Sequence, residues 1–412
     1  MDTQKRGRDL LGKDVIRFRH AERLFLEEAI RWGYQEIRTP TIEPISLFTA
    51  AGTLDPRMLD NLYSFLDWDG WSGQRVVLRP DGTIPASRLY IEHFAAIEQA
   101  VRLCYVADMF SYDENGTSEH RQCGVELIEG HDAGPAASDA EVIELALSIL
   151  KKMGFESPLV RIGYPPLIRE MLDAAGLSAE EKEKVLGLIH AKNRDELNRL
   201  AGPKGLEKLL GLLDLRSSSA DFIKNVGSFL PRTAGVEAAL GAFADSVGAL
   251  AGAGIPFEIT FSLPLNFEYY TGLVMEAYPD SARTGRGDIL MSGGRYDNLT
   301  AILSEDRIAA RAVGLAFKID RIVASPEFTA ALAERAVLVV PGDDRAFTRR
   351  VVSALRDRGL VAEIASAGQD PATFRWVLTG HGNTLRLSDS STGKILDLTM
   401  ENIGDIPDLI GR

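Results

Sequence analysis

The chain has 412 residues, of which 45% are hydrophobic and 25% are charged, and its formal net charge is −13 at pH 7. This composition is typical of a globular protein with two or three domains, and the acidic balance argues against a protein that wraps nucleic acid. The sequence has no run of about 18 apolar residues and no apolar signal core, so we expect a cytoplasmic protein without a membrane span.

The N-terminal third alternates helices with extended segments. Residues 13–34 have a helical periodicity that ends at Gly33, and Pro40 and Pro44 make the next segment, TPTIEP, extended. Ser138 is the predicted N-cap of a later amphipathic helix. In chain order we predict two strands, a helix, a strand hairpin with a polar turn, and that capped helix: 62–67, 75–79, 83–99, 104–129 and 138–154.

The two cysteines, Cys104 and Cys123, fall on the two arms of the predicted hairpin. Neither their spacing nor the expected compartment favours a disulfide, so we predict reduced thiols. A metal site would need His120 and His131 as further ligands. We predict no metal.

In the second half of the chain the predicted secondary structure changes twice. From about 165 to 255 the sequence is helical and Leu-rich without strand-like segments, and strand patterns return at 257–263. Residues 336–364 have a strand–turn–helix–strand pattern, which is typical of a small α/β unit. We therefore predict an α+β protein: an antiparallel sheet core over 1–328, interrupted by the helical block, and a small α/β domain over 329–412.

Four oxygen-bearing side chains are candidates for ligand binding. In LRPDGT, Asp81 and Thr83 follow the end of a strand, where their oxygens suit an ammonium group. The alternative is a simple β-turn with Thr83 as a helix cap. In HRQCGVELIEG, Gln122 and Glu126 lie four residues apart and so point to one face of a strand. They form either the floor of a polar pocket or a solvated sheet face.

Two later stretches add aromatic and basic candidates. NFEYYTGLVMEAY places Tyr269 and Tyr270 at the start of a strand, where they either sandwich a planar ring or serve as core and turn tyrosines. SGGRYDNL and AVGLAFKIDRI contain Arg295 and Arg321, each of which, taken singly, is more often a surface charge than a ligand. No phosphate-binding Gly-rich loop and no Ser-His-Asp arrangement can be read from the spacing.

Taken in order, LRPDGT, QCGVEL, EYYTGLVMEAY, GGRYDNL and VGLAFKIDR resemble the catalytic domain of histidyl-tRNA synthetase, a class II aminoacyl-tRNA synthetase. The resemblance covers roughly residues 10–325. It implies an antiparallel sheet flanked by helices, a dimer formed through TPTIEP, and an insertion where the helical block lies. It also implies that histidine is held by the matching positions Asp81, Thr83, Gln122, Glu126, Tyr269 and Tyr270.

The nucleotide-binding positions depart from the synthetase pattern. Ser111 stands where the second class II motif has an arginine for the α-phosphate, and Leu265 stands where the synthetases have a catalytic arginine. Arg321 still matches the arginine of the third motif. Loss of one such charge-stabilising group typically costs about 10²–10³-fold in rate. We therefore expect no amino-acid activation and no cofactor.

GVELIEG, EYYTGLVMEAY and the short C-terminal segment resemble the regulatory subunit of ATP phosphoribosyltransferase, a synthetase paralogue of bacterial histidine biosynthesis. The resemblance implies a non-catalytic subunit that supports the condensation of ATP with phosphoribosyl pyrophosphate and its feedback inhibition by histidine. The implied partners are the short-form catalytic subunit, a second copy of the chain and histidine, whereas tRNA is not expected. The alternatives are a diverged amino-acid-activating ligase and a tRNA or amino-acid sensor paralogue.

Overall fold

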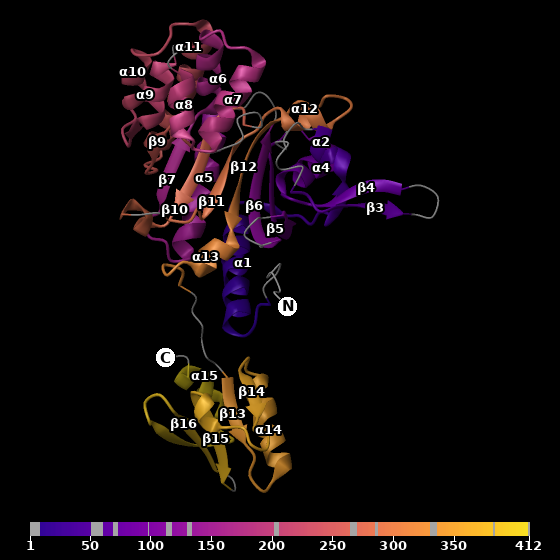
Figure 1. The fold of residues 1–412 in the computed structure, drawn as a ribbon. Coiled ribbons are helices and arrows are strands. Elements are labelled where there is room, and N and C mark those ends of the chain that lie inside the picture. The colour runs from indigo at the N-terminus through magenta and orange to yellow at the C-terminus, as the bar shows by residue number, and fades with distance from the viewer. Residues whose placement is uncertain are drawn as a thin grey trace. The chain divides into compact units, whose positions relative to one another are not determined.

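The computed structural model describes eleven stretches of the chain: 9–50, 61–68, 73–97, 99–112, 118–129, 134–201, 206–263, 270–284, 287–329, 336–381 and 384–410. They divide into two compact units, Met1–Ala330 and Ala331–Arg412. Figure 1 shows the helices and strands of both units with the labels used below.

The first unit contains a nine-stranded sheet and a three-stranded sheet. The large sheet has the order β1-β5-β6-β12-β11-β10-β7-β9-β8 and is antiparallel except for the β1–β5 and β7–β9 pairs. The small sheet is antiparallel and has the order β2-β4-β3. The strands are β1 (Gln35–Glu36), β2 (Ile42–Pro44), β3 (Ser64–Trp68), β4 (Gly73–Leu78), β5 (Val101–Phe110), β6 (Glu119–Glu129), β7 (Leu159–Gly163), β8 (Arg216–Ser217), β9 (Glu258–Thr260), β10 (Val274–Tyr278), β11 (Met291–Arg295) and β12 (Arg311–Lys318).

Helices cover both faces of the large sheet and form a separate group at its β7–β9 end (Figure 1). This group, α6 to α11, is the helical block between the strands β7 and β9, and it also contains the two-residue strand β8, which the sequence did not predict. The helices are α1 (Lys13–Arg31), α2 (Ile45–Ala50), α4 (Thr83–His93), α5 (Pro135–Lys152), α6 (Pro165–Ala174), α7 (Ala179–His190), α8 (Arg194–Ala201), α9 (Glu207–Asp214), α10 (Phe222–Gly227), α11 (Ala234–Gly252), α12 (Leu299–Leu303) and α13 (Ile319–Ala324).

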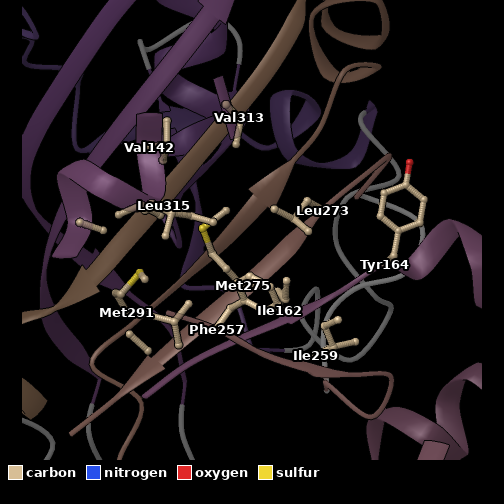
Figure 2. Packing of buried hydrophobic residues seen from close by; sticks show 14 of the residues in the cluster. Val142, Ile162, Tyr164, Phe257, Ile259, Leu273, Met275, Met291, Val313 and Leu315 are labelled. Carbon is tan, nitrogen blue, oxygen red and sulfur yellow. The ribbon is translucent and has the colours of Figure 1, made fainter. Parts of the chain in front are cut away.

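The main hydrophobic core lies on one face of the large sheet. Alternate residues of β12, β11 and β10 point to this face, because successive strand residues point to opposite sides. Figure 2 shows Val313, Leu315 and Met275 close to Val142 of α5, and all four side chains are buried. A second core, between the opposite face and the helices α2, α4 and α12, includes Leu103.

Two helix boundaries differ from the sequence prediction for physical reasons. The helix α4 ends at His93, earlier than the predicted 83–99, with Phe94 as its C-cap. The helix α5 begins at Pro135 after the N-cap Gly134, because proline suits the first helical position. Ser138, the predicted N-cap, lies inside α5 with its buried hydroxyl bonded to other side chains.

The helix α11 is, by length and composition alone, long and apolar enough to cross a membrane. It is a continuous helix of alanine, glycine and apolar residues. It packs against α5 and against α6 and α10 of the helical block. Its side chains Val236, Phe243 and Val247 are buried in the main core. These contacts give its apolar residues a protein partner within the first unit.

The second unit is a five-stranded sheet of order β14-β13-β15-β16-β17. The strand β13 pairs in parallel with β14 and β15, and α14 connects β13 to β14, so the predicted strand–turn–helix–strand pattern is confirmed. Its elements are β13 (Ala336–Val340), α14 (Arg345–Arg356), β14 (Val361–Ile364), β15 (Trp376–His381), β16 (Thr384–Asp389), β17 (Ile395–Thr399) and α15 (Ile406–Ile410).

Candidate functional site

The candidate site lies on the face of the large sheet that α4 and α12 cover, around the strands β6 and β12. In the antiparallel register Glu126 of β6 pairs with Leu103 of β5 and with Gly314 of β12. Gln122, four residues earlier, pairs with Lys318. Directly paired residues share a face, so Gln122, Glu126 and Lys318 all point to this side of the sheet.

Glu126 is the centre of a buried cluster of oxygens. Its side chain has no solvent exposure, and its Oε1 accepts a hydrogen bond of 2.8 Å from the hydroxyl of Thr83 at the start of α4. Its other oxygen accepts a hydrogen bond from the hydroxyl of Tyr296. Burial, together with the neighbouring negative charge of Asp81, raises the pKa of Glu126 to about 8, although both hydroxyl groups oppose the rise. A solvated sheet face is thereby excluded for this residue.

At the start of α4, the hydrogen bonds of Asp81 and Thr83 differ from the alternative in which Thr83 is the helix cap. The carboxylate of Asp81, not the hydroxyl of Thr83, accepts the backbone N–H of Ile84 at 3.0 Å. Removal from water raises the pKa of Asp81 to about 6, and the backbone N–H groups of Thr83 and Ile84 partly offset that rise. The Thr83 hydroxyl is thus left to contact Glu126.

Gln122 reaches the cluster through an aromatic side chain. Its Nε2 donates a hydrogen bond of 3.2 Å to the hydroxyl of Tyr105 on the neighbouring strand β5. Burial, and the nearby carboxylates of Glu126 and Asp81, raise the pKa of the Tyr105 hydroxyl well above its usual value. Tyr105 therefore remains a neutral hydroxyl between the amide and the carboxylates.

Tyr270 is the part of the tyrosine pair that the structure describes. Its ring packs against Leu263 and Val274. Burial raises the pKa of its hydroxyl, and the charges of Glu126 and Asp81 add to the rise. Tyr269 and Leu265 lie outside the described residues.

Three glycines allow the side chains of Tyr105, Glu126 and Tyr270 to approach the sheet backbone closely. A Cβ at Gly124 would lie 2.2 Å from Cζ of Tyr105. A Cβ at Gly314 would lie 1.8 Å from Oε2 of Glu126, and one at Gly294 would lie 2.8 Å from Cδ1 of Tyr270. Each contact is shorter than a van der Waals distance. The absence of a side chain at each position is therefore a condition for the arrangement of the site.

This geometry predicts the effect of Gly314→Ala. The added methyl group must displace the Glu126 carboxylate, so we expect a loss of about 1–3 kcal/mol in the free energy of unfolding, as for other overpacked interiors. Urea denaturation of the full chain measures the loss. The matched control is Gly187→Ala inside α7, where a Cβ meets nothing within 4 Å. The control should gain up to about 1 kcal/mol from helix propensity. Equal stability of the two variants would contradict the prediction.

The positions expected to face a nucleotide offer little free positive charge. Ser111 ends the hairpin arm, and its backbone N–H donates to the carbonyl of Ser118 at 3.2 Å. Arg121, next to Gln122 on the opposite arm, points to the other face of the sheet, where it forms ion pairs with Glu22 at 2.8 Å and with Asp108 at 2.9 Å. These carboxylates neutralise its guanidinium.

The exposed side chain of Arg321, at the start of α13, forms an ion pair of 2.7 Å with Asp288. This residue is the arginine that matches the third motif, and a carboxylate from its own chain already binds it. Its exposure agrees with the sequence interpretation of Arg321 as a surface charge.

The same interpretation is wrong for Arg295, which is 3% exposed. Its guanidinium bonds to Asp139 and Ser138 of α5 at 2.9 and 2.6 Å, and to Asp297 at 3.0 Å. Burial raises the pKa of Asp139 to about 6 even though Arg295 opposes the rise. Asp139 also accepts a hydrogen bond of 2.9 Å from Ser246 of α11, so this polar cluster connects the sheet, α5 and the helical block.

Three residues of the site face were not predicted: Tyr105, Tyr296 and Lys318. Tyr296 belongs to SGGRYDNL, in which the glycines and the arginine drew attention. Tyr105 lies opposite the strand glycine Gly124, and Lys318 is a lone charge in an apolar strand; both signals need the strand register, which the sequence does not show directly. Tyr296 lies opposite Ala312 and has no such signal.

The described thiols agree with the prediction for the cysteines. Cys104 and Cys123 are free and buried on the far side of β5 and β6. Burial raises the pKa of Cys104 to about 12, so its thiol is neutral at physiological pH.

Comparison with known proteins gives consistent results. The family model described as histidyl-tRNA synthetase matches residues 7–322. The chain is 36% identical over 380 residues to an ATP phosphoribosyltransferase regulatory subunit of Dehalococcoides mccartyi, covering 90% of this chain and 89% of the relative. It is 30% identical to a histidine–tRNA ligase of Methanosphaerula palustris, with 97% of each chain covered.

A solved structure supports the fold. The chain resembles an ATP phosphoribosyltransferase regulatory subunit/histidyl-tRNA synthetase from Bacillus halodurans with a TM-score of 0.74 and 25% identity, covering 89% of this chain and 92% of that one. The predicted α+β fold of the class II synthetase type is confirmed. The chain therefore belongs to the histidyl-tRNA synthetase family and, within it, to the ATP phosphoribosyltransferase regulatory subunits.

Proposed function

We propose that this chain is a regulatory subunit of ATP phosphoribosyltransferase that has no catalytic activity of its own. It assembles with the short-form catalytic subunit, supports the first step of histidine biosynthesis, and transmits feedback inhibition by histidine. The observation that carries the proposal is a contrast on the hairpin β5–β6. A buried carboxylate cluster surrounds Glu126, whereas Ser111 has no charge, Arg121 points to the other face of the sheet, and Arg321 is already neutralised by Asp288.

The cluster is chemically suited to a cationic amino acid. Asp81 and Glu126 both have raised pKa values, about 6 and about 8, and each disfavours ionisation of the other. A ligand ammonium or imidazolium placed between them would favour their ionised forms, so binding and deprotonation are linked. The hydroxyl of Thr83 and the ring of Tyr270 complete a set of neighbours suited to histidine.

Activation of an amino acid needs positive groups directed at the α-phosphate, because the transition state gathers negative charge there. Ser111 offers only a hydroxyl, Arg121 points to the other face of the sheet, and the guanidinium group of Arg321 would first have to leave Asp288. This argues for a binding function over ligase chemistry.

Regulation then follows from linkage. Histidine changes the activity of the catalytic subunit only by the difference between its affinities for two states of the assembly. A binding site on a non-catalytic chain can supply that difference. It needs no catalytic group of its own.

Co-purification tests this function. The full chain is expected to bind a short-form ATP phosphoribosyltransferase, to increase its rate of phosphoribosyl-ATP formation, and to make that rate sensitive to histidine. Gln122→Ala should weaken histidine inhibition about 10-fold while assembly persists, because it removes the hydrogen bond to Tyr105. The matched control is Glu119→Ala at the exposed end of β6. Failure of the wild-type chain to bind or to activate the catalytic subunit would overturn the proposal.

The 30% identity to a histidine–tRNA ligase supports a second candidate, an amino-acid-activating ligase. The two candidates differ in one measurable reaction. A ligase exchanges pyrophosphate into ATP in the presence of its amino acid, whereas the regulatory subunit is expected to give no exchange with any amino acid. Clear exchange that depends on histidine would favour the ligase.

A further inference from the structure

Lys318 is a cationic residue of the site face to which the proposed function assigns no role. It is the last residue of β12, directly opposite Gln122, and its backbone N–H donates to the carbonyl of Leu290 at 2.8 Å. Its register places its side chain on the same face as Glu126. It thus lies at the opposite end of the site from Asp81 and Glu126, where the negative charges of Glu276 and Asp288 act on it.

The ammonium of Lys318 has no ion pair with any carboxylate in the described parts of the chain. Its neighbours are already engaged, because Asp288 binds Arg321 at 2.7 Å and Glu276 accepts a hydrogen bond from Tyr278. Burial lowers the pKa of Lys318, with Glu276 and Asp288 opposing the shift and Arg321 adding to it. A partly desolvated ammonium with three donors is costly until an anionic acceptor binds it.

The dimensions of the face suit a free amino acid. Gln122 and Glu126 are four residues apart on one strand, which is about 13 Å. The flexible four-carbon stem of lysine reaches back over part of this span. Between Lys318 and Glu126 the face carries Ala316 and, next to it, Ser292, both small and partly exposed, while the ring of Tyr105 lies against Gly124 on the β5 side of the gap.

The number of charges favours a carboxylate over a phosphate. Arg321, the next cation along the chain, is already neutralised by Asp288. A single lysine is a compact point charge that balances one negative charge, whereas phosphate sites usually combine several cations or backbone donors.

We propose that Lys318 binds the carboxylate of the amino acid whose amino group and ring are held by Asp81, Thr83 and Glu126. This assignment rests on the proposed histidine site. It adds that the site is specific for a free amino acid over the corresponding amine, which has no carboxylate. The carboxylate lies between the ammonium of Lys318 and the amide of Gln122.

Calorimetric titration of the full chain with histidine and with histamine tests the assignment, because histamine has the same ring and amino group but no carboxylate. We expect the wild-type chain to bind histidine at least 10-fold more tightly. Lys318→Met should weaken histidine binding 10- to 100-fold and leave histamine binding unchanged, as expected for loss of a charge-assisted hydrogen bond. Lys318→Arg should retain most of the discrimination, and the control Lys224→Met, on the exposed surface of α10, should behave as wild type.

Three outcomes would overturn the assignment, and they are distinguishable. If the wild-type chain binds both compounds equally, or Lys318→Met weakens both equally, the carboxylate is not read by Lys318 although the histidine site stands. If the wild-type chain binds neither compound, the proposed histidine site itself fails. If inorganic phosphate displaces histidine more strongly than acetate does, and Lys318→Met removes that difference, the ammonium belongs to a phosphate site.

Discussion

Arg295→Met should destabilise the first unit by about 3–5 kcal/mol, the usual cost of removing one partner from a buried ion pair. The cost is large because Asp139, 1% exposed, would lose the ion pair of 2.8 Å that compensates its charge. Its pKa, already raised to about 6, should rise further, so that the loss grows as the pH increases above 6. Urea denaturation of the full chain at pH 6 and pH 8 measures both effects.

Two comparisons make this prediction specific. Arg321→Met breaks the exposed ion pair with Asp288 and should cost less than about 1 kcal/mol. Adding Asp139→Asn to Arg295→Met should recover part of the lost stability, because an amide leaves no uncompensated charge in the cluster. If Arg295→Met costs no more than Arg321→Met, the buried cluster does not hold the sheet and α5 together.

Glu126→Gln should remove a pH dependence of stability between pH 6 and pH 8. The folded-state pKa of Glu126, about 8, lies above its usual value, so the folded chain holds a proton that the unfolded chain releases. Its contribution to stability is therefore complete at low pH and is lost as the pH rises through 8. The slope is about 1.4 kcal/mol per pH unit, or about 2–3 kcal/mol over this window.

The difference between the unfolding free energies of the wild-type chain and Glu126→Gln isolates this group. Asp139, which titrates near pH 6 in the Arg295 cluster, contributes equally to both curves, and any change in the titration of Asp81, also near pH 6, falls at the lower edge of the window. The amide has the same shape and can still bond to the hydroxyls of Thr83 and Tyr296, so the variant should fold. Glu119→Gln, at the exposed end of the same strand, should leave the slope unchanged. Parallel curves for the wild-type chain and Glu126→Gln would refute the prediction.

Strand periodicity alone predicted the most useful relation in the site. The spacing of Gln122 and Glu126 places both on one face, and the hairpin register puts both beside β12. The hydrophobic pattern of the hairpin fixes that register, since a slip of one residue in β6 would turn Glu126 to the main core and Val125 and Leu127 away from it. The class II fold followed from the order of the motifs.

The rest depends on contacts between distant segments. The burial of Arg295 results from the packing of α5 and α11 on the sheet, and no neighbour in sequence indicates it. Both Asp81 and Thr83 carry an oxygen that suits a helix start. The sequence does not show that Asp81 accepts the backbone N–H of Ile84 while the Thr83 hydroxyl bonds to Glu126. Likewise, the sequence does not show that Lys318 lacks an ion pair among the described residues, because this depends on the partners that Asp288 and Glu276 have in the fold.

Arg79, the residue that precedes PDGT, joins two segments through neutral acceptors alone. Its guanidinium bonds to the carbonyl oxygens of Thr39, Pro40 and Asp108 at 2.8, 3.2 and 3.1 Å, and to the Thr39 hydroxyl. No acceptor in this joint can take up a proton, unlike Glu43, which bonds to Arg88 nearby. The hydrogen bonds that hold TPTIEP to the turn carrying Asp81 need no ionised acceptor. They should therefore persist at a pH where the neighbouring carboxylates of Asp108 and Glu43, whose charges act on Arg79, are protonated.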